Sequence, residues 1–108
     1  MIHELRAYWA NPGKLDALNA RFRTHTIRLF TKHGITVVAF WTPDDREQHG
    51  DLIYVLGYPS REERERRFGA FAADPEWLAA KAASEVEGKL VGKITSDFLT
   101  PTDYSPMQ

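Results

Sequence analysis

The chain has 108 residues, the size of a single domain. Hydrophobic residues make up 43% of it and charged residues 27%, a composition that excludes wholesale disorder. Cysteine is absent, which excludes disulfide bonds, thiolate metal sites and a cysteine nucleophile. The formal net charge of -1 does not favour a nucleic-acid partner, and no apolar stretch approaches the ~20 residues of a membrane span. The N-terminal residues lack the features of a signal peptide, so we expect a cytoplasmic protein.

The first half of the chain predicts a strand, a helix and two further strands. Residues 2–9 alternate apolar and polar side chains, as a strand with one polar face does. Between residues 14 and 33 the apolar side chains recur at helical steps, and Gly34 ends that helix. Residues 35–42 and 51–58 are rich in β-branched and aromatic side chains, which predicts two strands joined by a polar hairpin loop.

The second half predicts two consecutive helices and a fourth strand. Ser60 and Glu63 fit a capping box, which opens a highly charged helix. Asp74 followed by proline predicts the start of another helix. Residues 93–100 predict the last strand, and residues 101–108 are expected to form an extended tail. The side chains that we expect the second of these helices to turn inward are Trp77, Leu78 and Ala82.

The resulting order, β-α-β-β-α-β, predicts an α+β fold of the ferredoxin-like class. Residues 1–108 then form one domain, in which helices cover one face of a four-stranded antiparallel sheet. In the strand predicted for residues 51–58, apolar side chains occupy both parities, so the face without helices also disfavours contact with water. A second copy of the chain is the simplest cover for that face, and we therefore expect a homodimer.

Short motifs with a shared order and spacing lie along nearly the whole chain. They are Glu4-Leu5-Arg6-Ala7-Tyr8, Pro12-Gly13-Lys14-Leu15, Lys32-His33-Gly34, Phe40-Trp41-Thr42, Ala73-Asp74-Pro75-Glu76-Trp77, Leu99-Thr100-Pro101 and Tyr104-Ser105-Pro106. Together they resemble the NIPSNAP family. The resemblance implies a dimeric α+β barrel, in which two ferredoxin-like sheets pack across a two-fold axis and ligands lie between the sheet and the helices of each protomer. The wider superfamily of such barrels includes cofactor-independent monooxygenases, haem-degrading enzymes and isomerase-like proteins, whereas NIPSNAP proteins have no well-defined common reaction.

His25 is the candidate catalytic residue. It falls in the apolar stripe of the first predicted helix, three residues after Phe22 and four before Leu29. From that stripe it could reach a cavity beside the sheet and act as an acid, a base or a ligand anchor. The resemblance supports this role, because family members often carry histidine here. The alternative is a half-buried histidine that forms a hydrogen bond with a strand side chain.

The candidate ligand-binding residues lie on the predicted strands. Arg6 shares a strand parity with Glu4 and Tyr8, so Arg6 and Tyr8 could anchor an anionic ligand. The preferred interpretation is structural: Arg6 and Glu4 compensate each other or a partner across the dimer. Trp41 and Tyr54 are the aromatic residues that we expect to shape an apolar cavity. The pattern does not decide which sheet face the helices cover, because both faces are apolar.

Other polar clusters are interpreted as surface. The carboxylates and histidine of residues 44–51 match no metal motif and indicate a solvated hairpin turn. The charged run of residues 62–67 predicts a solvent-exposed helix face with Glu62–Arg66 and Glu63–Arg67 ion pairs. The chain has no phosphate loop, dinucleotide fingerprint or nucleophile elbow, and we expect neither a cofactor nor a metal site.

The favoured functional hypothesis is the binding or conversion of a small apolar or aromatic molecule between sheet and helices, by a monooxygenase-like or isomerase-like protein. Whether the protein is an enzyme stays open. The first alternative is a non-catalytic dimeric interaction module that presents its charged helix to another protein. A weaker alternative is haem binding or degradation, because the chain has four histidines.

Overall fold

Four strands form one antiparallel sheet, in the order β2-β3-β1-β4, in the computed structural model, which describes residues 1–108. The central strands are β1 (Ile2–Ala10) and β3 (Leu52–Tyr58), and the edge strands are β2 (Thr36–Trp41) and β4 (Val91–Leu99). Because β1 pairs with both β3 and β4, the first strand of the chain lies inside the sheet. The predicted ferredoxin-like α+β fold is confirmed.

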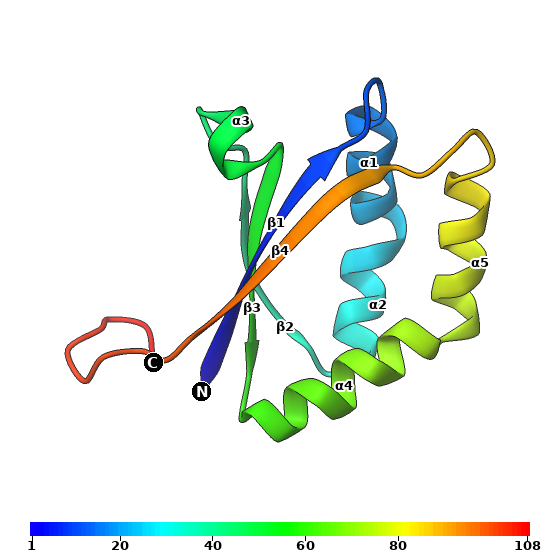
Figure 1. Ribbon diagram of the computed structural model, residues 1–108. Helices are drawn as coiled ribbons and strands as arrows, with labels where there is room; N and C mark the ends of the chain where they lie inside the picture. The colour runs from blue at the N-terminus through cyan, green and yellow to red at the C-terminus, as the bar shows by residue number, and fades with distance from the viewer.

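The helices form a second layer against one face of the sheet. Figure 1 shows α1, α2, α4 and α5 together on that side, whereas the short α3 and the C-terminal tail lie on the other side. None of the helices combines the length and the apolarity needed to cross a membrane. The helical segments are α1 (Leu15–Arg21), the π-helix η1 (Phe22–Thr26), α2 (Ile27–Lys32), α3 (Arg46–His49), α4 (Arg61–Ala73) and α5 (Pro75–Ser84).

The turn and cap signals of the sequence form as predicted. Gly34 ends the helical segment with a φ of +74°, a conformation that glycine adopts without steric cost. The Ser60 hydroxyl accepts a hydrogen bond from the backbone N–H of Glu63 at 3.1 Å and caps α4. The Asp74 carboxylate caps α5 by accepting the backbone N–H of Glu76 at 2.8 Å. These local contacts fix the end of α2 and the starts of α4 and α5.

Asp74 also holds the two halves of the helical layer together. Its second carboxylate oxygen lies 2.8 Å from Lys32 Nζ and 2.7 Å from His33 Nε2, at the C-terminal end of α2. The Asp74 side chain is almost fully buried. One carboxylate therefore caps α5 and binds the end of α2, which makes the helix–helix junction depend on its charge.

The second helical segment differs from its prediction in what it buries. Helix α5 packs against α1, η1 and α4, and none of its residues is fully buried. The expectation that Leu78 points inward is wrong, since its side chain is 51% exposed, and Ala82 is exposed as well. Trp77 is partly buried, as predicted, and packs against Phe71 with the ring centroids 4.8 Å apart.

The ion pairs of α4 agree with the prediction in part. Glu63 and Arg67 pair at 3.1 Å, as their spacing of four predicts. Arg66 pairs at 2.6 Å with Glu63 and not with Glu62. Arg64 is not a surface residue of the charged run, because its side chain is only 16% exposed and points toward the sheet. The solvent face of α4 therefore carries less free positive charge than its sequence indicates.

The two faces of the sheet have different chemistry. On the helix-facing side, β3 contributes side chains that are fully buried: Tyr54, Leu56 and Tyr58. The register aligns this side of β3 with one side of β1. There β1 carries polar residues at alternating positions: Glu4, Arg6 and Tyr8. The opposite face is free of helices, and on β1, β2 and β3 it carries apolar side chains that are only partly covered: Leu5, Trp9, Trp41, Ile53 and Val55. The edge strand β4 places Lys93, Thr95 and Asp97 on this face. Apolar residues thus occupy both parities of β3, as expected.

A buried network of charges joins the sheet to α4. The Glu4 carboxylate has no exposure to solvent and accepts hydrogen bonds from Arg6 Nη1 at 2.9 Å and from Ser96 Oγ at 2.6 Å. Arg64 donates to the same carboxylate through Nε at 3.1 Å and Nη2 at 2.9 Å. Burial alone would raise the pKa of Glu4, but hydrogen bonds from Arg64 and Ser96 and the charge of Arg6 outweigh it and lower the pKa. The negative charge of one buried glutamate is thus shared between the positive charges of two arginines.

Glu4→Gln should destabilise the protein by about 3 kcal/mol, because it leaves two buried guanidinium groups without their counter-charge. The measurement is urea denaturation at neutral pH, with Glu62→Gln as the matched control on the solvent-exposed side of α4. The control should change the free energy of unfolding by less than about 0.5 kcal/mol. A Glu4→Gln protein as stable as this control would contradict the role of the network.

Stability should also fall in acid. Hydrogen bonds from Lys32 and His33 lower the pKa of Asp74 below its ordinary value of 3.8, and the pKa of Glu4 lies below its ordinary 4.5. Carboxylates with a lowered pKa in the folded state stabilise it above those ordinary values, and the contribution is lost as the pH falls through the folded-state pKa. The free energy of unfolding should therefore decline below about pH 4.5, and Glu4→Gln should make that decline shallower. A wild-type protein whose stability is unchanged down to about pH 3 would exclude this account.

Candidate functional site

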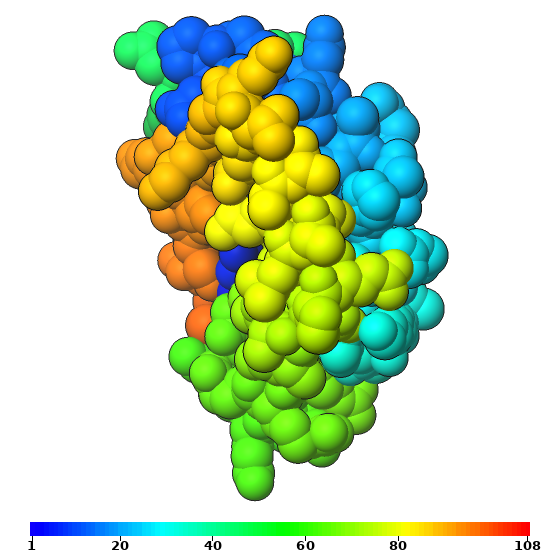
Figure 2. All heavy atoms as spheres, turned by 90° about the vertical axis from the view of Figure 1, so that its right-hand side faces the viewer, coloured from blue at the N-terminus to red at the C-terminus, as the bar shows by residue number.

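A cavity of about 330 Å³ lies between the sheet and the helices α4 and α5. Figure 2 shows it as a hollow between β4 (orange) and the yellow-green helices, with atoms of β1 (dark blue) at its base. The helices leave the inner side of the edge strand β4 open, and Ile94 there is 48% exposed. The residues that line the cavity are Arg6, Tyr8, Arg21, Phe68, Phe71, Ala72, Trp77, Lys81, Glu85, Lys89, Val91 and Ile94.

Arg6 and two tyrosines build the polar base of this cavity. The register pairs Arg6 with Tyr54 across β1 and β3, and Arg6 Nε donates to the Tyr54 hydroxyl at 2.8 Å. Arg6 Nη2 donates to the Tyr8 hydroxyl at 3.1 Å, and Tyr54 donates to Tyr8 at 2.9 Å. Three of the predicted ligand-binding residues are thus in one hydrogen-bonded group. Tyr54 is fully buried and stands behind the other two, which reach the cavity.

The surroundings of Arg6 and Tyr54 shift the pKa of each side chain upward, which keeps both protonated. Burial alone would lower the pKa of Arg6, but its contacts with Tyr54, Tyr8 and Glu4 raise it. Burial raises the pKa of Tyr54 well above its usual value. At neutral pH the base of the cavity therefore carries a charged guanidinium and a protonated Tyr54. The ion pair of Arg6 and Glu4 that the sequence favours is present, and it leaves Arg6 at the cavity surface.

Arg21, at the end of α1, is the second arginine of the cavity, and the sequence pattern does not single it out. Its Nη1 donates to Ser84 Oγ at 3.1 Å and lies 3.7 Å from Glu85. Burial lowers the pKa of Arg21, and the charge of Glu85 opposes that change. Arg21 Nε is buried and has no hydrogen-bond partner. The helical wheel places Arg21 away from the apolar stripe, but α5 packs over that side of α1 and buries it.

Aromatic rings form the walls. The Arg6 guanidinium carbon lies 4.8 Å from the ring centre of Phe68, and that of Arg21 lies 5.1 Å from the ring centre of Trp77. Phe71 packs between the two rings, 5.6 Å from Phe68 and 4.8 Å from Trp77. The cavity therefore combines positive charge at its base with flat apolar surfaces at its sides, an arrangement that suits a small molecule with a ring.

His25 does not reach this cavity. It lines a shallow groove of about 360 Å³ between η1 and α5, together with small side chains such as Ala20 and Ala83. The reason is the π-helix, whose turn holds one residue more than an α-helical turn. Thr26 therefore lies buried below Phe22, and His25 is rotated away from the sheet. The alternative of a hydrogen bond to a strand is not formed either, since His25 Nδ1 is buried without a partner.

Trp41 and Tyr54 lie on opposite faces of the sheet. Trp41 is 49% exposed and lines a hollow on the helix-free face, with Val55 and residues of the C-terminal tail. Phe40, the preceding residue, is the one that stacks on Tyr54, with ring centres 4.7 Å apart. A strand alternates its side chains, so only one of Phe40 and Trp41 can face the helices. The structure therefore does not bring Trp41 together with the other predicted site residues.

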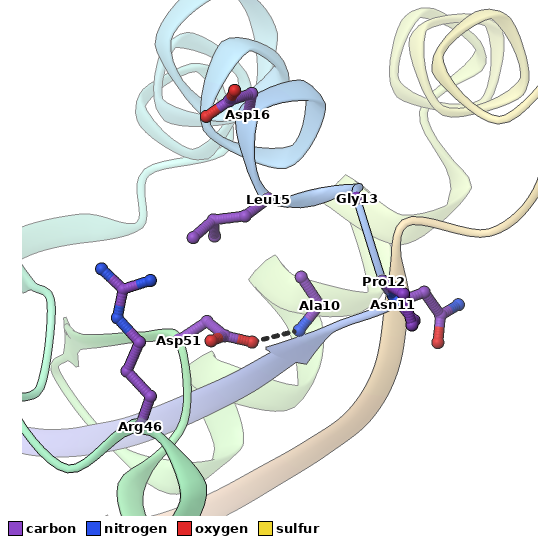
Figure 3. Close-up of a pocket in the computed structure, with 8 residues that line it drawn as sticks. All are labelled: Ala10, Asn11, Pro12, Gly13, Leu15, Asp16, Arg46 and Asp51. Carbon is purple, nitrogen blue, oxygen red and sulfur yellow. Dashed lines mark hydrogen bonds between the residues drawn. The ribbon is translucent and has the colours of Figure 1, made fainter.

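A second hollow of about 300 Å³ lies at the end of β1, where the chain enters α1 (Figure 3). Asp51 there accepts the backbone N–H of Ala10 at 2.8 Å, so its carboxylate holds the end of the strand. Asp16 of α1 and Arg46 of α3 also line this hollow. No three histidine, aspartate or glutamate side chains of the chain converge as metal ligands would, and none of the four histidines lines the cavity at α4 and α5.

Known proteins share this architecture. A NIPSNAP family protein of Agrobacterium tumefaciens is 26% identical, with 99% of this chain and 98% of that chain covered and a TM-score of 0.85. An uncharacterized NIPSNAP-like domain protein of Burkholderia xenovorans is 22% identical, with 97% and 88% covered and a TM-score of 0.80. An antibiotic biosynthesis monooxygenase has the same fold at 12% identity, with 94% and 99% covered and a TM-score of 0.56.

Among curated proteins, none is similar enough to match the chain. The profile of the NIPSNAP family matches residues 3–106. This range contains all the helices and all the strands, except for the first residue of β1. The resemblance seen in the sequence motifs is thereby confirmed. The chain belongs to the NIPSNAP family.

Proposed function

We propose that this NIPSNAP protein binds a small organic anion with a flat apolar body in the cavity at α4 and α5. The observation that carries the proposal is the excess of basic side chains, Arg21 among them, over acidic ones in the lining of the cavity. Buried polar groups nearly always have a hydrogen-bond partner, and a charged donor without one is costly. Arg21 lines the cavity and its Nε has no acceptor in the protein, so a ligand oxygen with negative charge in the cavity would supply its guanidinium group with a counter-charge.

The charge of the cavity supports an anion. Four of its lining residues are basic and only one is acidic: Arg6, Arg21, Lys81 and Lys89 against Glu85. Glu4 lies behind the cavity and is shared between Arg6 and Arg64, so it leaves an excess of positive charge. Positive charge in a partly enclosed site attracts anions strongly, because water screens it little there.

The size and walls of the cavity support a ring-containing body. Its volume of about 330 Å³ is roughly twice the ~150 Å³ of an apolar cavity that holds one benzene molecule. Phe68 and Trp77 offer flat surfaces on which a ring can pack. Conversion of the bound molecule, by a monooxygenase-like or isomerase-like reaction, is the finer part of the proposal. It is supported by the likeness in fold to an antibiotic biosynthesis monooxygenase.

Isothermal titration with 4-nitrobenzoate tests the binding of an anion. The wild-type protein should bind this probe, and Arg21→Gln should weaken binding about 10- to 100-fold, the effect of one lost hydrogen bond to a charged group. Arg23→Gln is the matched control, since Arg23 lies two residues further along the chain, in η1, with an exposed side chain. Its affinity should equal that of the wild type. Absence of binding by the wild type, or equal affinities in both variants, would refute the proposal.

We also propose that the helix-free face of the sheet is the interface of a homodimer. This face gathers partly exposed apolar side chains from three strands, among them Trp9, Trp41 and Val55. Figure 1 places only α3 and the C-terminal tail on this side. An exposed apolar surface of this kind favours association, and a two-fold axis lets the same face cover itself.

Val55→Lys should convert the dimer into a monomer, because it places a charge in the middle of the apolar face. Light scattering should give twice the chain mass of 12.4 kDa for the wild type and the single mass for the variant. Leu78→Lys, which changes an exposed apolar residue of α5, should remain dimeric. A wild-type protein that is monomeric at all concentrations would overturn the interface, without affecting the proposal for the cavity.

A further inference from the structure

The hydroxyl group of Tyr8 has a hydrogen atom that no group of the protein accepts. Its oxygen already accepts two hydrogen bonds, from Arg6 Nη2 at 3.1 Å and from the Tyr54 hydroxyl at 2.9 Å. A phenolic oxygen has one O–H to donate and two positions at which it accepts. Both accepting positions are occupied, and Tyr8 lines the cavity. Its own hydrogen is therefore the one that remains for a ligand.

The hydrogen bonds that lead to Tyr8 run in one direction. Arg6 donates to Tyr54 at 2.8 Å, and Tyr54 donates onward to Tyr8. Tyr54 has no solvent exposure, so its hydroxyl has nowhere else to donate. Consecutive hydrogen bonds polarise one another, and this chain begins at a guanidinium charge. The hydroxyl of Tyr8 is therefore a stronger donor than an isolated tyrosine, and it favours an acceptor with negative charge.

The edge of the Arg6 guanidinium group formed by Nε and Nη2 is occupied, so this edge cannot bind a carboxylate with two parallel hydrogen bonds. Nε and Nη2 donate to the two tyrosines, and Nη1 donates to Glu4. The usual two-pronged binding of a carboxylate needs two free donors on one edge of the guanidinium group. What the base of the cavity offers is one strong O–H donor backed by a positive charge. That geometry suits a single oxygen atom.

We infer that Tyr8 binds the ligand by one negatively charged oxygen on a planar conjugated framework, that is, a phenolate or an enolate. The inference rests on the proposed function, since it places the ligand in the same cavity. The walls agree with it, because Phe68 and Trp77 present flat faces to a conjugated body. Such a ligand is ionised on binding, and the site stabilises its anion relative to its neutral form.

The probe for this inference is 4-nitrophenol, because its phenol and phenolate forms absorb at different wavelengths. Titration of its absorbance against pH should show that the pKa of the bound probe is about one unit lower than that of the free probe, a tenfold preference for the phenolate. Tyr8→Phe should abolish most of this shift, because it removes the O–H donor that stabilises the phenolate. Tyr104→Phe is the matched control, since Tyr104 lies exposed in the C-terminal tail, and it should keep the full shift.

The wild-type result decides the inference even if Tyr8→Phe fails to fold. If the protein binds 4-nitrobenzoate but leaves the pKa of 4-nitrophenol unchanged or raised, the proposed function stands and the inference is wrong. If neither probe binds, both are wrong. If the shift occurs but persists in a folded Tyr8→Phe protein, the donor is another group of the cavity, and the assignment to Tyr8 is overturned.

Discussion

The buried ion pair of Glu4 and Arg6 is the constraint around which this small fold is organised. A carboxylate without solvent exposure is tolerated only because Arg6, Arg64 and Ser96 all bind it. Arg64 comes from α4, so the same contacts fix that helix to the sheet. Two guanidinium groups share one carboxylate, and the helix-facing side of the sheet thereby retains positive charge. The chemistry of the cavity follows from this imbalance.

The cavity exists because the two helices of the second half are not equivalent. Helix α4 is bound to the sheet through Arg64, whereas α5 packs on α1, η1 and α4 and leaves the inner side of β4 open. The space between them is enclosed by aromatic side chains of α4 and α5 and by β1 at its base. Asp74 lies at the turn between these helices, where it caps α5 and binds the end of α2. The shape of the site thus depends on a junction outside it.

Features set by a few neighbouring residues could be predicted from the sequence. The caps at Ser60 and Asp74 and the turn at Gly34 are of this kind, and so are the strands, whose β-branched and aromatic residues stand out. Arg6, Tyr8 and Tyr54 could be singled out by parity, and the register unites them. Arg21 and His25 could not be placed, because their positions depend on the packing of α5 and on a π-turn. Neither the packing of α5 nor the π-turn produces a periodic pattern in the sequence.

Strand β1 is where the two faces of the protein meet. Its alternation puts Glu4, Arg6 and Tyr8 on the helix side and Leu5 and Trp9 on the open side. A shift of one residue would exchange these sets, moving the buried charges onto the apolar face. Pairing on both edges, with β3 and β4, prevents such a shift. A charged site and an apolar face can therefore lie on opposite sides of a single strand, because its register is held from both sides.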